Sequence, residues 1–231
     1  MQCVILAAGK GTRMLPLTKT IPKPLIKVCG KPILDHIVEA LPANITELVI
    51  VTNYLEEQIR AHCGEEFYGR KVTYVHQDNP AGGTGNALLC TKNLLTGKFI
   101  VLNGDDIHGA EALVEAVQEP YSILAVYSET PELFGVLEKN EDGTLKAIVE
   151  KPKEPTSNLV NTGGFVTDLA LFENDVAVSD AGELYATDML TQCASFKKVK
   201  IIEQKKWLPI GYPEDIKKAE YILEKFGGKL A

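Results

Sequence analysis

Two glycines and four cations directly after the first apolar run of the chain could bind a phosphate group. Residues 3–8 predict a buried strand, and Gly9 and Gly11 follow it. Glycine has no Cβ, so the backbone can take a positive φ there and bring its N–H groups close to a polyphosphate. The next residues bring four cations within fourteen residues and no acid: Lys10, Arg13, Lys19 and Lys23. In a chain of net charge -7, this local reversal of sign indicates an anionic ligand.

Two common glycine motifs do not fit this loop. The P-loop places its lysine after the second glycine, whereas Lys10 lies between the two glycines. The dinucleotide-binding fingerprint needs a third glycine where Met14 stands. An ordinary turn between strand and helix is the remaining alternative for a single glycine. The arginine and the lysines favour a phosphate-binding loop.

Acidic residues follow the most strand-like run of the chain, residues 99–103. In an open α/β sheet, ligands gather at the carboxyl ends of the strands, so we expect Asp105 to face the site. A carboxylate there can hold Mg²⁺, which keeps waters and bridges phosphate oxygens. Asp106 and His108 come next, and for both we favour a loop-capping role over metal ligation.

A second glycine-rich loop, residues 77–85, lies between a predicted strand at 72–76 and a predicted helix at 86–95. Three glycines and a threonine would let a flat ring lie against the backbone while N–H and C=O groups contact its edge. A plain connecting loop is the alternative. The segment is therefore a candidate site for a flat ring of a ligand.

The elements that must position these loops alternate between strand and helix. Beyond the runs above we expect a helix at 30–41 opened by Pro32, a strand at 48–52, and a helix ending at 63 with a capping box of Asn53 and Glu56. Residues 1–109 thus predict parallel, doubly wound packing. Residues 136–139 and 144–149 flank Asn-Glu-Asp-Gly, which predicts an antiparallel hairpin, and 214–226 predict an amphipathic helix. The expected fold is a three-layer αβα domain with a mostly parallel, twisted, Rossmann-like sheet and added antiparallel strands.

Length and composition set the broad class of protein. A chain of 231 residues with 45% hydrophobic residues predicts a single domain. We expect no membrane span and no signal peptide, because no long apolar run occurs and the first strand begins at residue 2 or 3. Five scattered cysteines favour a reducing cytoplasm over a disulfide or zinc framework. The excess of acid argues against nucleic-acid binding, and the apolar face of the last helix makes a homo-oligomer plausible.

The run Leu-Ala-Ala-Gly-Lys-Gly-Thr-Arg-Met, followed by Pro-Lys-Pro-Leu, resembles the signature of the sugar-1-phosphate nucleotidylyltransferases, also called nucleotide-sugar pyrophosphorylases. The resemblance extends from residue 3 to about residue 220. It implies the nucleotide-diphospho-sugar transferase fold, with a nucleotide-binding half at 1–109 and a sugar-binding half at 110–231. It also implies that a nucleoside triphosphate and a sugar 1-phosphate give a nucleotide-sugar and pyrophosphate, with Mg²⁺ as cofactor.

The same resemblance assigns roles to particular residues. The catalytic cations would be Arg13, Lys23 and Lys151, and the metal ligand Asp105. The nucleotide-binding residues would be Leu6, Ala8, Gly9, Gly11, Thr12, Gln77, Gly83 and Thr84. Sugar-binding residues come from Phe-Gly-Val, Glu-Lys-Pro, Asn-Thr-Gly-Gly and Glu-x-x-x-Thr-Asp segments, and they are Gly135, Glu150, Asn161 and Glu183. Plain capping of a helix N-terminus is an equal alternative for Glu183.

One position departs from the family pattern. The Trp-x-x-x-Gly-x-Pro turn of many relatives carries an aspartate as a second metal ligand, and Pro209 stands there in this chain. Asp105 and the phosphates could hold Mg²⁺ with more water, another residue could substitute, or the enzyme could be impaired. The last case would make the chain a nucleotide-sugar-binding regulatory subunit.

The substrates stay partly open at this stage. Gln77 and the Gly-Thr-Gly turn favour UTP or dTTP, which differ by one methyl group on the base. The sugar is open. A phosphocholine-type cytidylyltransferase is a further alternative, but it would need an aromatic cage for the quaternary ammonium. This chain has one tryptophan and carries the sugar segments.

Overall fold

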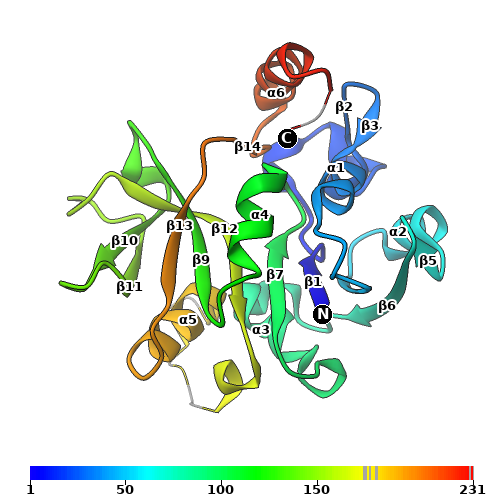
Figure 1. Ribbon diagram of the computed structural model, residues 1–231. Helices are drawn as coiled ribbons and strands as arrows, with labels where there is room; N and C mark the ends of the chain where they lie inside the picture. The colour runs from blue at the N-terminus through cyan, green and yellow to red at the C-terminus, as the bar shows by residue number, and fades with distance from the viewer. Residues whose placement is uncertain (174–175, 177, 180–181, 229, 231) are drawn as a thin grey trace.

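Strands and helices alternate through most of the computed structural model (Figure 1), which describes residues 1–173, 176, 178–179, 182–228 and 230. The strands of the main sheet are β1 Gln2–Leu6, β4 Glu47–Thr52, β5 Glu66–Phe67, β6 Arg70–His76, β7 Phe99–Asn103, β9 Ser122–Tyr127, β10 Gly135–Lys139, β11 Leu145–Glu150, β12 Leu159–Thr167 and β13 Lys200–Glu203. The short strands outside it are β2 Lys27–Val28, β3 Lys31–Pro32, β8 Asp106–His108 and β14 Trp207–Pro209. The α-helices are α1 Ile33–Ala40, α2 Glu56–Cys63, α3 Gly83–Leu89, α4 Ala110–Ala116, α5 Ala186–Ala194 and α6 Pro213–Lys225.

The centre of the main sheet is parallel, as the alternation of strands and helices predicts. β1 lies between β7 and β4, and β4 pairs with β6, all in parallel register. The second half of the chain adds antiparallel pairs, β12 with β7 and with β9, and the hairpin of β10 and β11. The predicted mostly parallel sheet with antiparallel additions is confirmed.

Helices cover both faces of this sheet. Side chains alternate along a strand, so Cys3 and Ile5 of β1 enter one apolar cluster and Val4 enters another. The first cluster is completed by α1, α2, α4 and α6, and the second by α3 and α5. Burial on both faces is typical of parallel sheets, and it confirms the three-layer αβα architecture.

The carboxyl ends of the parallel strands lie side by side at one edge of the sheet. Leu6 at the end of β1 is in register with Asn103 at the end of β7, and Thr52 of β4 is in register with His76 of β6. The loops that follow β1, β6 and β7 therefore emerge together. These are the three loops whose residue types indicate ligand binding.

Several helix starts differ from the sequence expectation. Pro32 belongs to β3, so α1 begins one residue later. Asn53 does not cap α2, because the residue at the N-cap position of that helix is Leu55. The side-chain amide of Asn53 instead donates to the Gln77 carbonyl at 2.9 Å. The helix expected at 86–95 begins earlier, at Gly83, and ends at Leu89. At Asn53, a hydrogen bond to the loop that follows β6 thus replaces the predicted helix cap.

The C-terminal part also differs in detail. Trp207–Pro209 forms a strand that pairs with β8, an element that the sequence did not predict. Helix α6 buries Ala219 and Leu223 as expected, but Phe226 lies half exposed beyond its last turn. None of the helices in the described ranges combines the length and the apolar character needed to cross a membrane.

His108 lies in the core, and the prediction that it caps a loop is wrong. It is part of β8, is 1% exposed, and its Nδ1 lies 3.3 Å from Gln204 Oε1. Burial lowers the pKa of His108 from 6.5 to about 4. The unfolded chain therefore takes up a proton between these values that the folded chain does not, and stability falls as the pH drops from 6.5 to 4.

We expect this histidine to make the protein acid-sensitive by roughly 3 kcal/mol across that window. Urea unfolding of wild type and His108→Asn at pH 7 and pH 4 measures the effect. The variant is expected to lose less stability than wild type between the two values. An equal loss in both proteins would contradict the assignment.

Candidate active site

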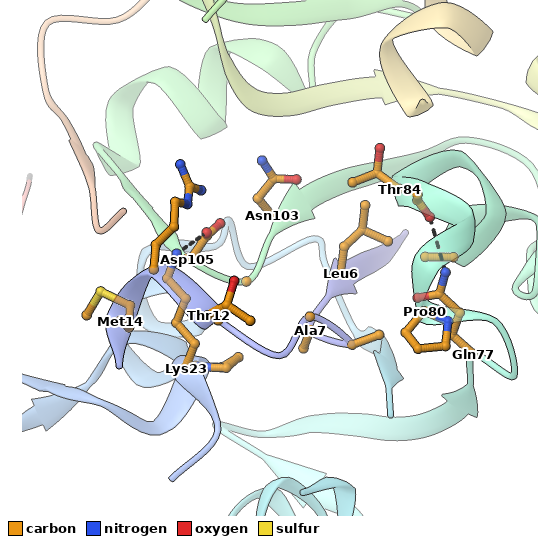
Figure 2. Close-up of a pocket in the computed structure, with 18 of the residues that line it drawn as sticks. Leu6, Ala7, Thr12, Met14, Lys23, Gln77, Pro80, Thr84, Asn103 and Asp105 are labelled. Carbon is orange, nitrogen blue, oxygen red and sulfur yellow. Dashed lines mark hydrogen bonds and ion pairs between the residues drawn. The ribbon is translucent and has the colours of Figure 1, made fainter. Parts of the chain in front are cut away.

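A cavity of about 430 Å³ opens at the carboxyl edge of the parallel strands. Figure 2 shows its wall, with Gln77, Pro80 and Thr84 at one end, Met14, Lys23 and Asp105 at the other, and Leu6 and Ala7 between them. The nucleotide-binding residues predicted from the sequence, together with Arg13, Lys23 and Asp105, all contribute to this lining. The structure thus brings the first-half candidates together in one place.

The loop after β1, residues 7–14, is called the phosphate loop below. Its conformation depends on Gly11 and not on Gly9. Gly11 has φ +60 and precedes a short 3-10 helix, Thr12–Met14, whose Met14 side chain is buried. A Cβ on Gly11 would lie 3.0 Å from a methyl carbon of Thr18 and 3.1 Å from Cβ of Lys23. A Cβ on Gly9 would meet no atom within 4 Å, and its φ is not positive. Gly11 therefore holds the turn, while Gly9 is exposed.

Lys23 and Asp105 form an ion pair at the wall of the cavity. Lys23 is 7% exposed, and its Nζ lies 2.5 Å from Asp105 Oδ2 (Figure 2). The Asp105 side chain is one third exposed. This pair places a cation and a carboxylate together, with the carboxylate open to a ligand.

Asp105 fits a magnesium site only if a ligand supplies further oxygens. In the described part of the chain, no group of three or more His, Cys, Asp or Glu side chains could hold a metal. Mg²⁺ is commonly bound by one or two carboxylates together with substrate phosphates and water. A partly open carboxylate beside the phosphate loop matches that donor set.

Asp106 holds the side chain of Asn103, a residue of the cavity wall. Its carboxylate is buried and accepts hydrogen bonds from Asn103 Nδ2 at 3.0 Å and from Trp207 Nε1 at 3.1 Å. Burial, followed by the negative charge of Asp105, raises the pKa of Asp106. The predicted loop-capping role is therefore wrong, since Asp106 fixes the Asn103 amide. Asn103 lines the cavity and was missed, although a polar residue that ends a central strand is a usable signal.

Pro209 lies next to the two aspartates, in the strand that the sequence did not predict. It is the register partner of Asp106, and Ile210 N donates to the Asp105 carbonyl at 3.1 Å. Pro209 offers no side-chain oxygen. The segment around it instead supports the main chain that carries Asp105.

Gln77 is buried at the other end of the cavity with its amide orientation fixed. Its Nε2 donates to the carbonyls of Asn79 and Gly83, at 3.0 and 3.1 Å, and to Asn86 Oδ1 at 3.0 Å. These acceptors take up the N–H side of the amide, so Oε1 is the atom that it can offer to a ligand. Gln77 therefore has a hydrogen-bond acceptor to offer at this end of the cavity.

The glycines of the second glycine-rich loop, residues 77–85, are also required by packing. A Cβ on Gly83 would lie 2.4 Å from the Leu184 carbonyl oxygen, and Gly85 N donates to that oxygen at 2.7 Å. The hydroxyl of Thr84 accepts from Ala186 N at 3.0 Å. The second glycine-rich loop is thus joined directly to Leu184 and to the first residue of α5, Ala186.

Three of the predicted sugar residues lie at or next to the start of α5: Glu183 just before it, Glu150 against Thr187 of its first turn, and Gly135 beside Glu150. Glu150 accepts from the Thr187 hydroxyl at 3.0 Å, and a Cβ on Gly135 would lie 3.0 Å from Glu150 Oε1. Glu183 accepts from the Tyr185 hydroxyl at 2.5 Å, which raises the pKa of Tyr185. Desolvation raises the pKa of Glu150. Glu183 precedes α5 by three residues and does not begin the helix.

Asn161 and Lys151 lie elsewhere in the second half of the chain. The side-chain Oδ1 of Asn161 accepts from Gly163 N at 3.0 Å, and a Cβ on Gly163 would lie 2.2 Å from Asn103 Nδ2. This strand thus approaches the cavity wall closely. Lys151 follows β11 with φ +43, and its side chain is exposed. Neither residue lines the 430 Å³ cavity, and the same holds for Gly135, Glu150 and Glu183.

Comparisons with known proteins agree with this arrangement. A family model described as nucleotidyl transferase matches residues 2–225. The bifunctional protein GlmU of Methanococcus maripaludis is 35% identical over 240 residues, which cover 100% of this chain but 57% of that protein. The UTP–glucose-1-phosphate uridylyltransferase AglF of Haloferax volcanii is 36% identical over 239 residues, 97% of each chain. The chain thus spans little more than half of one of these relatives and nearly all of the other.

Solved structures share the fold. A Bacillus anthracis protein assigned as a glucose-1-phosphate thymidylyltransferase superimposes with a TM-score of 0.86 at 28% identity, over 96% of this chain and 94% of that chain. A UDP-glucose pyrophosphorylase bound to UDP-glucose superimposes with a TM-score of 0.85 over 97% of this chain and 98% of that chain. At 24% identity, this match supports a shared fold only. The chain therefore belongs to the nucleotidyl transferase family, among the sugar-1-phosphate nucleotidylyltransferases.

Proposed function

We propose that the chain transfers a nucleotidyl group from UTP or dTTP to a sugar 1-phosphate, with Mg²⁺, and releases pyrophosphate. The observation that carries the proposal is the division of one cavity into two ends. Gln77 offers an acceptor at one end, and the phosphate loop with the Lys23–Asp105 pair lies at the other (Figure 2). A cavity of about 430 Å³ with this polarity suits a nucleoside triphosphate.

In the proposed reaction a sugar-phosphate oxygen attacks the α-phosphorus in line, and the protein aligns the two phosphates and neutralises charge. The backbone of the loop at Gly9 and Gly11 holds the β- and γ-phosphates, and Arg13 stabilises the departing pyrophosphate. Lys23 contacts the α-phosphate, and Lys151 orients the attacking phosphate. Bound Mg²⁺ would polarise phosphoryl oxygens and neutralise their charge.

Asp105 is the proposed metal ligand, and its ion pair with Lys23 orients both side chains before substrate binds. The pair holds the carboxylate at the wall of the cavity and keeps the ammonium beside it before any ligand is present. When the substrate phosphates and the metal enter, each partner gains a counter-charge without moving far. The sugar hydroxyls would then meet Glu150, Asn161 and Glu183, with Gly135 allowing close approach.

The orientation of Gln77 supports a uracil or thymine base. The N3–H of these bases donates to an acceptor such as Gln77 Oε1, whereas N3 of cytosine is itself an acceptor. This contrast also disfavours the cytidylyltransferase alternative. Thymine and uracil differ by a methyl group, so a small difference between dTTP and UTP is expected.

We expect UTP to be used at least tenfold better than CTP, because an unpaired buried acceptor costs about 1–3 kcal/mol. Gln77→Leu should lower kcat/KM for UTP by a similar factor and remove most of the preference. The exposed Gln118→Leu is the matched control and should behave as wild type. Equal use of both nucleotides by wild type would contradict the assigned base pocket.

Pyrophosphate release tests the function as a whole. The assay combines UTP, dTTP, CTP, ATP and GTP with a panel of sugar 1-phosphates, starting with glucose 1-phosphate because that sugar appears in the names of the uridylyl- and thymidylyltransferase relatives. Release with UTP or dTTP and one sugar phosphate is the expected result. Binding of nucleotide without release from any pair would favour the regulatory subunit, which Pro209 keeps as the second candidate.

A further inference from the structure

The guanidinium of Arg13 rests on an aromatic ring from the far end of the chain. Its Cζ lies 5.2 Å from the centroid of the Tyr212 ring, within the range of a cation–π contact. Among the ion pairs formed by described residues, none involves Arg13. Arg13 is exposed and lines the cavity beside Gly211.

Tyr212 is held in place by the start of α6. Gly211 N and Tyr212 N both donate to Asp215 Oδ2, at 3.0 and 2.8 Å. Two residues earlier, Ile210 N donates to the Asp105 carbonyl at 3.1 Å. The segment that carries the ring is thus anchored to α6 and to the main chain of the proposed metal ligand.

A ring suits this position better than a carboxylate would. An acid would pair with the guanidinium N–H groups and cancel its charge before phosphate arrives. An aromatic face attracts the cation from one side and leaves the N–H edges of the guanidinium unpaired. An exposed arginine also loses rotamer freedom when it binds phosphate, and contact with a ring on an anchored main chain removes part of that cost beforehand.

We propose that Tyr212 is a positioning residue, whose ring holds the Arg13 guanidinium beside the phosphate loop with its N–H groups free for the departing pyrophosphate. This inference rests on the proposed function for the role of Arg13. It assigns the segment after β14 a task beyond the support of Asp105. The aromatic ring, and not the hydroxyl, carries the effect.

The variants Tyr212→Leu and Tyr212→Phe separate the ring from the hydroxyl. We expect Tyr212→Leu to lower kcat for pyrophosphate release roughly two- to fivefold, the range of an exposed cation–π contact, with KM for the sugar 1-phosphate unchanged. Tyr212→Phe should keep the wild-type rate. The matched control is Tyr221→Leu, which removes an exposed ring of α6 whose centroid lies 4.0 Å from Lys225 Nζ and which does not line the cavity. That control should leave the rate unchanged.

A double-mutant cycle with Arg13→Ala tests whether Tyr212 acts through Arg13. The readout is the affinity for inorganic pyrophosphate with Mg²⁺, measured by calorimetry, so that it does not depend on turnover. Tyr212→Leu should weaken binding two- to fivefold in the wild-type background and have no further effect in Arg13→Ala. An unchanged affinity in the first background, or an equal loss in both, would overturn the proposal. Absence of turnover in wild type would instead count against the proposed function.

Discussion

Replacing Lys23 with methionine is expected to slow pyrophosphate release at least a hundredfold. Lys23 is 7% exposed, and its ammonium contacts Asp105 at the wall of the cavity. A preorganised cation beside developing charge in a water-poor site contributes on the order of 3 kcal/mol to the transition state. Methionine keeps the apolar stem that packs against Gly11, so the loss falls on the charge. Steady-state kinetics with saturating substrates measure the effect.

The matched control for this prediction is Lys19→Met. Lys19 belongs to the same cluster of cations but is exposed, and it does not line the cavity. We expect this variant to keep its rate within about twofold, since screened surface charges contribute little. Circular dichroism and thermal unfolding would show that both variants are folded. A Lys23→Met enzyme with a normal rate, or an equal loss in Lys19→Met, would remove Lys23 from the mechanism.

Replacing Asp105 with asparagine is the second large effect we expect. The amide keeps the size of the side chain and can still accept from Lys23, but it lacks the charge that a divalent cation requires. Metal stabilisation of phosphoryl oxygens contributes several kcal/mol, so a loss of roughly 3 kcal/mol, about a hundredfold in rate, should follow. Magnesium titrations should show half-saturation at a much higher concentration.

Asp142→Asn provides the control, because Asp142 is an exposed carboxylate at the tip of the hairpin between β10 and β11. Its rate and magnesium dependence should match wild type. If Asp105→Asn lowers the rate but leaves the magnesium titration unchanged, Asp105 is not the metal ligand. The ion pair with Lys23 would then be its role.

The parallel part of the sheet, formed by β1, β4, β6 and β7, was predictable because each strand and loop has its own local sequence pattern. Continuous apolar runs such as 99–103 indicate buried strands, and glycines with cations or acids mark the loops at their ends. The carboxyl ends of parallel strands share one edge, so the meeting of the phosphate loop, Gln77 and Asp105 followed from topology. The nucleotide-binding residues assigned from the sequence, with Arg13, Lys23 and Asp105, therefore line one cavity, whereas Asn103 of the same wall was not predicted.

What the sequence missed depends on tertiary partners. Asn53 has the type and spacing of a helix cap, yet its amide contacts the Gln77 carbonyl of the neighbouring loop. Trp207–Pro209 is too short to show the alternation typical of a strand, and it contains a proline. Its pairing with β8 could therefore not be predicted from the sequence. Asp106 and His108 resembled loop residues because the strand that buries them comes a hundred residues later in the chain.

The second half of the chain shows the same contrast between local and tertiary signals. Gly135 and Glu150 lie opposite each other because β10 and β11 form the predicted hairpin. The contact of Glu150 with Thr187 of α5 depends on the packing of that helix, which no local pattern specifies. The roles of Lys151, Asn161 and Glu183 came from resemblance, and they remain predictions.

Transfer of label from UTP tests the central claim most directly. UTP labelled at the α-phosphorus and, in a parallel reaction, at the γ-phosphorus is incubated with Mg²⁺, the protein and the sugar 1-phosphate that the release assay selects. We predict that the α-label appears in a nucleotide-sugar and the γ-label in pyrophosphate, in equal amounts. Appearance of the γ-label as inorganic phosphate, or no conversion of a nucleotide that binds, would contradict the account.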